Sequence, residues 1–223
     1  MKRKVFKTRG IRAMASGGVL LLIFALWTLL VQKADVQSVG VNGTDVGFAG
    51  INMWFHSLTG VNMTLYNITD WLGLVPVFVC MGFGVFGFIQ MIKRKSLLKV
   101  DKDIILLGVY YVIVIFGYLI FEMIPINYRP ILINGFMEAS YPSSTTLLVL
   151  SVMPTLIFQV NLRVKSTKIK GIMNIIVILF SVFMVAGRLV SGVHWLTDIV
   201  GSVFLSAGLY YCYKGTALCC LKE

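Results

Sequence analysis

Apolar residues dominate this chain in long runs that short polar segments interrupt. Five runs contain no charged residue and lie at 13–31, 71–92, 104–121, 145–160 and 172–187. At about 1.5 Å per helical residue, each run can cross most or all of a hydrocarbon core about 30 Å thick. A sixth run, 193–213, is broken by the carboxylate of Asp198 but is otherwise apolar and suitably long. The pattern therefore predicts six transmembrane helices.

The same runs indicate the fold class. Each segment within lipid must satisfy its own backbone hydrogen bonds, and long unbroken apolar runs do so as helices. We therefore expect an all-α bundle that forms a single membrane domain over residues 1–223. The longest polar segment, 32–70, is expected to be an outer loop. Within it, "VGFAGINMWFHSLTG" is amphipathic enough to form a helix on the membrane surface.

Composition excludes a soluble domain. Mean hydropathy is +0.88, 58% of residues are hydrophobic and only 13% are charged, which lies far outside the range of soluble globular proteins. The basic N-terminus followed by an apolar run could also be a signal peptide. However, 19 apolar residues are long for that role and the following "VQKAD" is a poor cleavage site, so we expect a retained first span.

The formal net charge of +11 bears on orientation. With the N-terminus inside, 17 of the 20 Lys and Arg residues fall in cytoplasmic segments, which is a strong positive-inside bias. Both termini are therefore predicted to be cytoplasmic. Basic residues in such a chain face anionic headgroups, so the expected partner is the lipid bilayer rather than nucleic acid. The compact chain favours a multi-pass protein of a bacterial plasma membrane.

Three basic residues, Lys33, Arg129 and Arg188, depart from this bias. A lone outer arginine commonly reaches to lipid phosphates. Arg129 and Arg188, however, each lie beside other polar residues, within 122–130 and 187–198, and a third polar segment, 140–146, is predicted at the same membrane face. These three segments indicate a site on the extracytoplasmic side.

The residue types in these segments suit phosphate chemistry. His194 and Asp198 are four residues apart, so on a helix they would share a face. The carboxylate could then fix the imidazole tautomer and leave the other ring nitrogen as a base or nucleophile. Ser191 could begin the sixth helix, and Pro142 with Ser143 could begin the fourth. Two helix N-termini and two arginines would bind an anion such as phosphate.

The motifs resemble those of a known family. Arg188, five residues, His194, three residues and Asp198 resemble the third signature of the type 2 phosphatidic acid phosphatase superfamily, which is related to vanadium haloperoxidases. "YRP" at 128–130 resembles the end of the first signature, and "YPSSTT" at 141–146 resembles the second. The resemblance covers about 104–213, the expected phosphatase-like core.

This resemblance implies a role for each matching residue. His194 would attack phosphorus to form a phosphohistidine, Asp198 would orient it, and Arg129 and Arg188 would hold the phosphoryl oxygens. Positioned charge of this kind is what phosphoryl transfer mainly requires. The second motif would complete the phosphate cradle with Ser143, Ser144 and Thr145.

Three positions depart from the family pattern. Glu122 replaces the usual lysine, Thr145 replaces the histidine that protonates the leaving oxygen, and Gly187 replaces a serine. A general acid contributes about 10² to 10⁴ in rate and matters most for a leaving alkoxide. A phosphate leaving group, with a pKa of about 6, needs it far less. The loss therefore favours a diphosphate such as a polyprenyl diphosphate. The candidates to replace the acid are Glu138, the best placed, Glu122 and His56.

Several other functions are compatible with these features. A lipid phosphotransferase would use the same residues, and a non-catalytic member could bind lipid phosphate without turnover. The paired His194 and Asp198 argue against pure binding, since a binder needs arginines more than a nucleophile. A transporter would place polar residues at the midplane, and a structural subunit would need no such cluster. No cluster supplies three metal ligands, so no metal or other cofactor is expected.

Overall fold

The regular structure of this chain is entirely helical in the part described. The computed structural model describes the backbone of residues 2–220 and the side chains of residues 6–220. Isolated β-bridges are the only strand-like pairings in this part, so the predicted all-α class is confirmed. In chain order the elements are α1 (Lys2–Lys33), η1 (Val41–Gly43), α2 (Ala49–Thr59), α3 (Met63–Leu72), α4 (Leu74–Arg94), η2 (Leu97–Lys99), α5 (Lys102–Met123), α6 (Ser144–Arg163), α7 (Thr167–Val190) and α8 (Leu196–Cys220).

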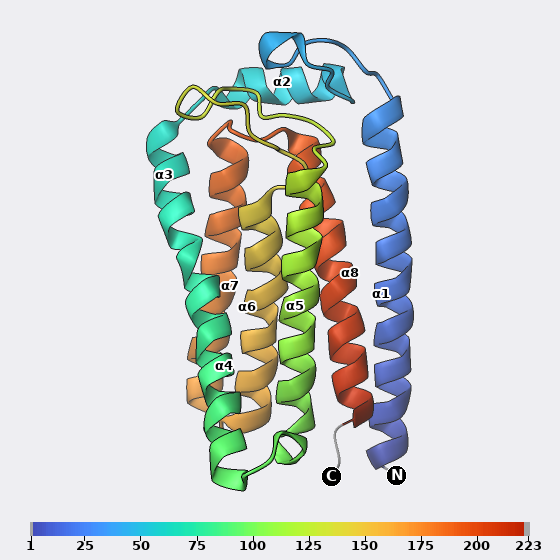
Figure 1. Ribbon diagram of the computed structural model, residues 1–223, viewed down its shortest axis with the longest axis vertical. Helices are drawn as coiled ribbons and strands as arrows, with labels where there is room; N and C mark the ends of the chain where they lie inside the picture. Colours follow the sequence, from blue (N-terminus) through green and yellow to red (C-terminus); the bar gives the residue numbers. More distant parts are fainter. Residues whose placement is uncertain (1, 221–223) are drawn as a thin grey trace.

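The long helices stand side by side, and α2 lies across one end of the bundle (Figure 1). α3 and α4 follow one another almost in line through Gly73. The loops that precede α6 and α8 meet beneath α2, whereas the start of α1, the end of α8 and the α4–α5 connection lie at the opposite end. The arrangement therefore separates a loop-rich end from an end that carries most of the basic residues.

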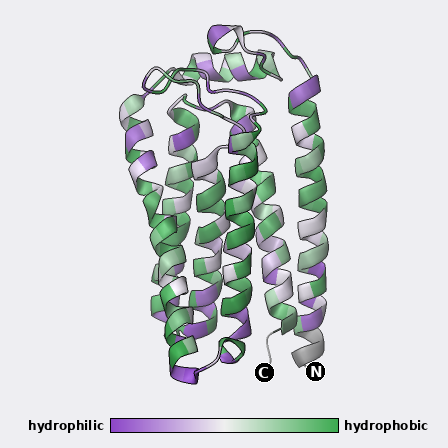
Figure 2. Ribbon diagram, viewed as in Figure 1, coloured by the Kyte–Doolittle hydropathy of each residue, from purple (hydrophilic) through white to green (hydrophobic). Residues whose placement is uncertain are grey.

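Five segments are long and apolar enough to cross a membrane, which makes this a multi-pass membrane protein. They are Phe6–Lys33, Met63–Arg94, Lys102–Met123, Ser144–Arg163 and Thr167–Val190. Hydrophobic residues fill the middle of the bundle and hydrophilic ones gather at both ends (Figure 2). α8, the expected sixth span, is not among the five. It runs beside α1 through the same depth of the bundle (Figure 1).

α1 packs closely against α8 because glycines line their contact. A Cβ at Gly17 would lie 2.8 Å from the backbone nitrogen of Cys212, and one at Gly215 would lie 2.6 Å from the carbonyl oxygen of Gly10. Real Cβ atoms do not approach backbone atoms this closely, so only glycine allows the helices to come together here. Small residues commonly serve this purpose between membrane helices.

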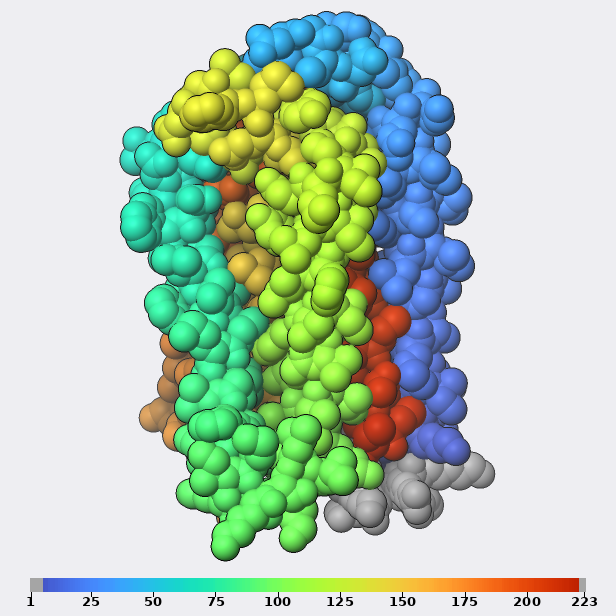
Figure 3. Space-filling model, viewed as in Figure 1, coloured from blue at the N-terminus to red at the C-terminus, as the bar shows by residue number. Residues whose placement is uncertain are grey.

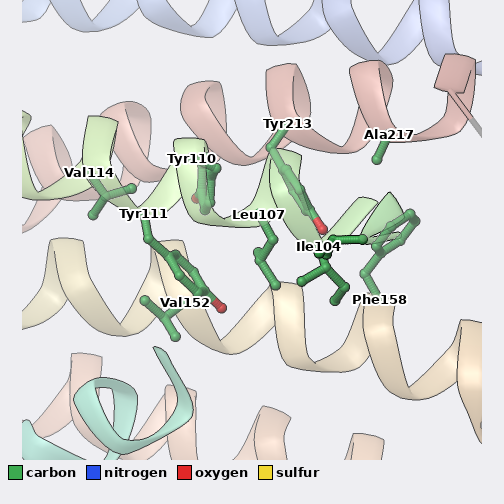
Figure 4. Packing of buried hydrophobic residues seen from close by; sticks show 10 residues of the cluster. Ile104, Leu107, Tyr110, Tyr111, Val114, Val152, Phe158, Tyr213 and Ala217 are labelled. Atoms are coloured by element: carbon green, nitrogen blue, oxygen red, sulfur yellow. The ribbon is translucent and has the colours of Figure 1, made fainter. Parts of the chain in front are cut away.

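The core between α5, α6 and α8 holds aromatic residues whose polar atoms are paired (Figure 4). Tyr110 donates to the carbonyl oxygen of Ser151 over 2.9 Å, and the hydroxyls of Tyr111 and Thr155 are 2.7 Å apart. Pairing of this kind removes the cost of burying a phenol in an apolar bundle. α6 is the central helix. Of its most apolar 18 residues, 56% are buried inside the bundle, against 11% for the corresponding stretches of α1 and α7.

α2 is fastened to the turn that begins α8. Asn52 donates from Nδ2 to Thr197 Oγ1 over 3.0 Å and accepts from the Thr197 backbone N–H over 3.2 Å. His56 Nε2 lies 3.1 Å from the carbonyl oxygen of Gly192, and its ring contacts that of Trp195. The amphipathic segment expected at the membrane surface thus forms a helix over the loop-rich end. Residues 63–70 of the expected outer loop belong instead to α3.

Candidate active site

The tight turn between α7 and α8 carries His194. Gly192 has φ of +68°, and a Cβ there would lie 1.8 Å from the carbonyl oxygen of Gly60. Both the left-handed backbone and the close approach require glycine. His194 is 3% exposed and lies before α8, whereas Asp198 lies in the first turn of that helix. The two residues are therefore not successive positions on one helix face, as the spacing had predicted.

Ser140 lies between His194 and Asp198. His194 Nδ1 is 3.7 Å from Asp198 Oδ2, too far for a hydrogen bond, but 3.1 Å from Ser140 Oγ. The Ser140 hydroxyl donates to Asp198 Oδ2, so the imidazole N–H donates to Ser140. Asp198 also accepts from Asn127 Nδ2 over 3.1 Å and from the Trp195 backbone N–H over 2.9 Å. The carboxylate thus orients the imidazole through a serine.

The other imidazole nitrogen has no partner. His194 Nε2 is buried without a hydrogen bond to any described residue, as are Nε and Nη1 of Arg129 and Nε of Arg188. Both guanidinium groups lie over the ring of Tyr66, at 5.6 Å and 4.7 Å from its centroid. Buried polar atoms without partners are uncommon and require an explanation. Here one anion with several acceptor oxygens would satisfy the arginine donors.

Electrostatics keep His194 in its neutral form. Burial, reinforced by the positive charges of Arg129 and Arg188, lowers the pKa of this imidazole to about 4, although the carboxylate of Asp198 opposes the shift. Only a neutral imidazole has the lone pair that a nucleophile needs. The ring is therefore in the reactive form at neutral pH, with Nδ1 protonated and Nε2 free.

Each arginine is paired with a partly exposed carboxylate. Arg129 Nη2 lies 3.0 Å from Glu138 Oε2, and Arg188 Nη1 lies 3.4 Å from Asp70 Oδ1. The two arginine side chains are 8% and 1% exposed, against 38% for Glu138 and 55% for Asp70. Since the carboxylates face solvent, these ion pairs add little to stability, and each arginine keeps unpartnered donors that another anion can use.

The second motif, residues 141–146, is hydrogen-bonded to the start of α8 and borders a cavity. Ser143 donates its backbone N–H to the carbonyl oxygen of Asp198 and its hydroxyl to Thr146 Oγ1, so both groups are already engaged within the protein. Ser144 and Thr145 instead line a cavity of about 430 Å³. A phosphate contact by Ser143, Ser144 or Thr145 stays a prediction.

This cavity is apolar and lies between α4, α5 and α6. Its polar end is formed by Asp70, Ser144 and Thr145, and its walls continue along the helices through residues such as Val77 and Leu148. A second cavity of about 630 Å³ shares Cys80 and Tyr111 with the first and extends to Leu97 near the opposite end of the bundle. Figure 3 shows the furrow between α4 and α5, with atoms of α6 at its base.

The proposed replacements for the missing acid lie in different places. Glu138 pairs with Arg129, Glu122 lines a separate small recess, and His56 contacts the Gly192 carbonyl. Gly187, where the family pattern has serine, faces α3, because a Cβ there would lie 2.7 Å from Thr69 Cγ2.

Sequence reasoning missed four residues of the site: Asn127, Ser140, Tyr66 and Asp70. Asn127 and Ser140 lie within the polar segments that carry the first two motifs, which was an available signal. Tyr66 and Asp70 had none, because they come from the segment interpreted as an outer loop. Among the described residues, no group of three or more His, Cys, Asp or Glu side chains could hold a metal ion.

The helical bundle thus brings a buried histidine, a carboxylate and two arginines together at one end, which is the arrangement that the motifs predicted. A family model of the PAP2 superfamily matches residues 77–216, and the chain belongs to that superfamily. The predicted family is thus confirmed, and with it a membrane protein of the lipid phosphate phosphatase kind.

The fold is similar to that of a solved relative. A transmembrane PAP2-type phosphatidylglycerolphosphate phosphatase from Bacillus subtilis matches with a TM-score of 0.62 and 17% sequence identity, over 90% of this chain and 94% of that one. At this identity the likeness establishes the fold alone. A comparison with curated proteins finds no match. The family match begins at residue 77, so α3 and Asp70 lie outside it.

Proposed function

We propose that this protein hydrolyses lipid-linked phosphate or diphosphate through a phosphohistidine on His194. The observation that carries the proposal is the buried, unpartnered Nε2 of a neutral imidazole, in the field of two arginines that also have unpartnered donors. A phosphoryl group placed there would receive the guanidinium donors of Arg129 and Arg188. Its phosphorus would then be open to the Nε2 lone pair.

The first chemical step forms the phosphoenzyme. The Nε2 lone pair attacks phosphorus, the P–N bond forms, and the P–O bond to the leaving group breaks. Positive charge develops on the ring as this happens. Asp198, acting through Ser140, stabilises that charge, and the arginines stabilise the negative charge on the phosphoryl oxygens.

The apolar cavity supports a lipid substrate. It begins at Ser144 and Thr145 and continues between the membrane helices, so a substrate with its phosphate at the arginines can lay an apolar chain along it. The second cavity continues the path towards Leu97, which favours a long chain such as a polyprenyl tail.

Thr145 favours a diphosphate as the reacting group. A threonine hydroxyl is a poor proton donor at neutral pH, so a leaving alkoxide would depart unprotonated. A leaving phosphate, with a pKa of about 6, needs no such donor. We therefore expect turnover of a lipid diphosphate to exceed that of the matched monophosphate, and equal turnover of the two would refute this preference.

Charge distribution supports an extracytoplasmic site in the plasma membrane. The loop-rich end that carries His194 is opposite the end with the basic α4–α5 and α6–α7 connections, and basic loops stay in the cytoplasm. This orientation also gives six spans, with α8 as the last. A cysteine at Asn42 should react in intact cells with a maleimide that does not cross membranes, and one at Lys168 should not. The reverse result would place the site inside.

The decisive experiment uses the two histidines of the chain as a matched pair. The purified protein is incubated with a lipid diphosphate labelled in its terminal phosphate, and acid-labile phosphate on the protein is measured with phosphate release. Wild type and His56→Ala should both form the phosphoenzyme, whereas His194→Ala should form none and lose turnover. Turnover by His194→Ala would remove the proposed nucleophile. Tight substrate binding without turnover by the wild type would support the non-catalytic alternative.

A further inference from the structure

We propose that Asp70, on α3, is the general base that deprotonates the water that hydrolyses the phosphohistidine. This inference rests on the proposed function. Asp70 is held beside the phosphate site by Arg188, whose Nη1 is 3.4 Å from Asp70 Oδ1. Its side chain is 55% exposed, so water reaches it freely.

Because Asp70 lines the cavity, a lipid tail held there would put Asp70 on the side where water attacks. Phosphoryl transfer proceeds with the incoming and departing groups roughly in line. The lipid leaving group therefore departs on the side of phosphorus away from His194, where the cavity that holds its tail begins. Water attacks the phosphohistidine from that same side once the lipid product has moved away. Asp70 and Thr145 both line this end of the cavity, and a side chain at Gly73, in the turn after Asp70, would lie 3.4 Å from Thr145 Cγ2.

The other acidic side chains near the site are less suited. Asp198 is fully buried, and its carboxylate oxygens accept hydrogen bonds from Asn127, Ser140 and Trp195. Glu138 is paired with Arg129 and does not line the cavity, and Glu122 lines a different recess. Asp70 is thus the one carboxylate among the described residues that contacts an active-site arginine and also lines the cavity.

The two half-reactions balance without an added acid. In the first, the terminal phosphoryl group passes to His194 and the lipid leaves as a monophosphate without needing a proton. In the second, Asp70 takes a proton from water as the water oxygen bonds to phosphorus. The P–N bond then breaks, its electron pair returns to Nε2, and Asp70 releases its proton to solvent. Asp70 thus supplies the proton transfer that Thr145 cannot.

The test is a pre-steady-state measurement on the full-length protein with a saturating polyprenyl diphosphate labelled in its terminal phosphate. In Asp70→Asn, steady-state turnover should fall by about 10² to 10⁴-fold. The initial burst of phosphoenzyme should persist, and labelled His194 should accumulate towards one phosphate per chain. Hydroxylamine, which attacks without a general base, should restore much of the lost turnover. Asp70→Glu should recover more of it than Asp70→Asn.

Glu138→Gln is the matched control, because it removes the carboxylate paired with the other arginine and should not cause phosphoenzyme to accumulate. The proposal is overturned if Asp70→Asn loses the burst and the turnover together, if it leaves turnover within a few-fold of wild type, or if Glu138→Gln accumulates the phosphoenzyme instead. Failure of the proposed function gives a different result, namely that wild type itself carries no phosphate on His194.

Discussion

Replacement of Ser140 by alanine should slow the enzyme without unfolding it. The Ser140 hydroxyl is the only polar group that joins Asp198 to His194 in the described structure, since the direct separation is 3.7 Å. Hydrogen bonds to charged groups are worth about 1.5–3 kcal/mol. If that energy holds the tautomer that exposes Nε2, its loss corresponds to a fall of about 10- to 150-fold in kcat, at 1.36 kcal/mol for each factor of ten.

The assay compares kcat and KM for a lipid diphosphate in Ser140→Ala and in Ser206→Ala. Ser206 is also buried, but its hydroxyl donates only to the Val203 carbonyl, so its removal controls for loss of a buried serine. We expect kcat to fall in the first variant with KM nearly unchanged, and the second variant to stay close to wild type. If Ser140→Ala keeps kcat within twofold of wild type, Asp198 does not act through this hydroxyl and the proposed relay is wrong.

Three further predictions concern pH, packing and the lipid tail. Because burial lowers the pKa of His194 to about 4, the imidazole should stay neutral, and kcat/KM should be maintained, until the pH falls towards that value. An acidic limb near 6.5 in the pH–rate profile would contradict this. Gly187→Ser should destabilise the protein by about 1–3 kcal/mol, because the new side chain would clash with Thr69. Thermal unfolding in detergent should show that adding Thr69→Ala restores part of the lost stability. If the destabilising effects of the two substitutions simply add, the clash is excluded. Val77→Trp should obstruct the cavity and raise KM for a long-chain diphosphate at least tenfold, with little change for a short-chain one; equal effects on both would place the tail elsewhere.

Most of the fold was predictable because the bilayer imposes it. Charge-free runs of fixed length identify membrane helices whatever their neighbours, and five of the six expected runs coincide with segments suited to span. The 32–70 segment was harder to interpret. Its last residues belong to α3, whose Tyr66 and Thr69 are buried against the bundle. The position of α3 therefore depends on tertiary contacts, which the local sequence does not show.

Of the site, only the residues that belong to the family motifs could be predicted from the sequence. Arg129, Arg188 and His194 do lie together, with both arginine charges acting on the imidazole. His194 Nδ1 lies 3.7 Å from Asp198 Oδ2, without the direct hydrogen bond that was expected, because α8 begins at Leu196 and the histidine lies in the preceding turn. Ser140 then fills the gap from a distant loop. Asp70 reaches Arg188 across 118 residues of sequence, a separation that no local pattern encodes.

The position of α2 affects how the products would separate. α2 lies over the loop-rich end and is bonded to the Gly192–Thr197 turn, while the apolar furrow faces sideways between α4 and α5 (Figure 3). Under the proposed reaction, the lipid product would return to the leaflet it came from without passing through water. Inorganic phosphate would have to leave past the exposed carboxylates of Glu138 and Asp70, whose like charge would discourage it from binding again.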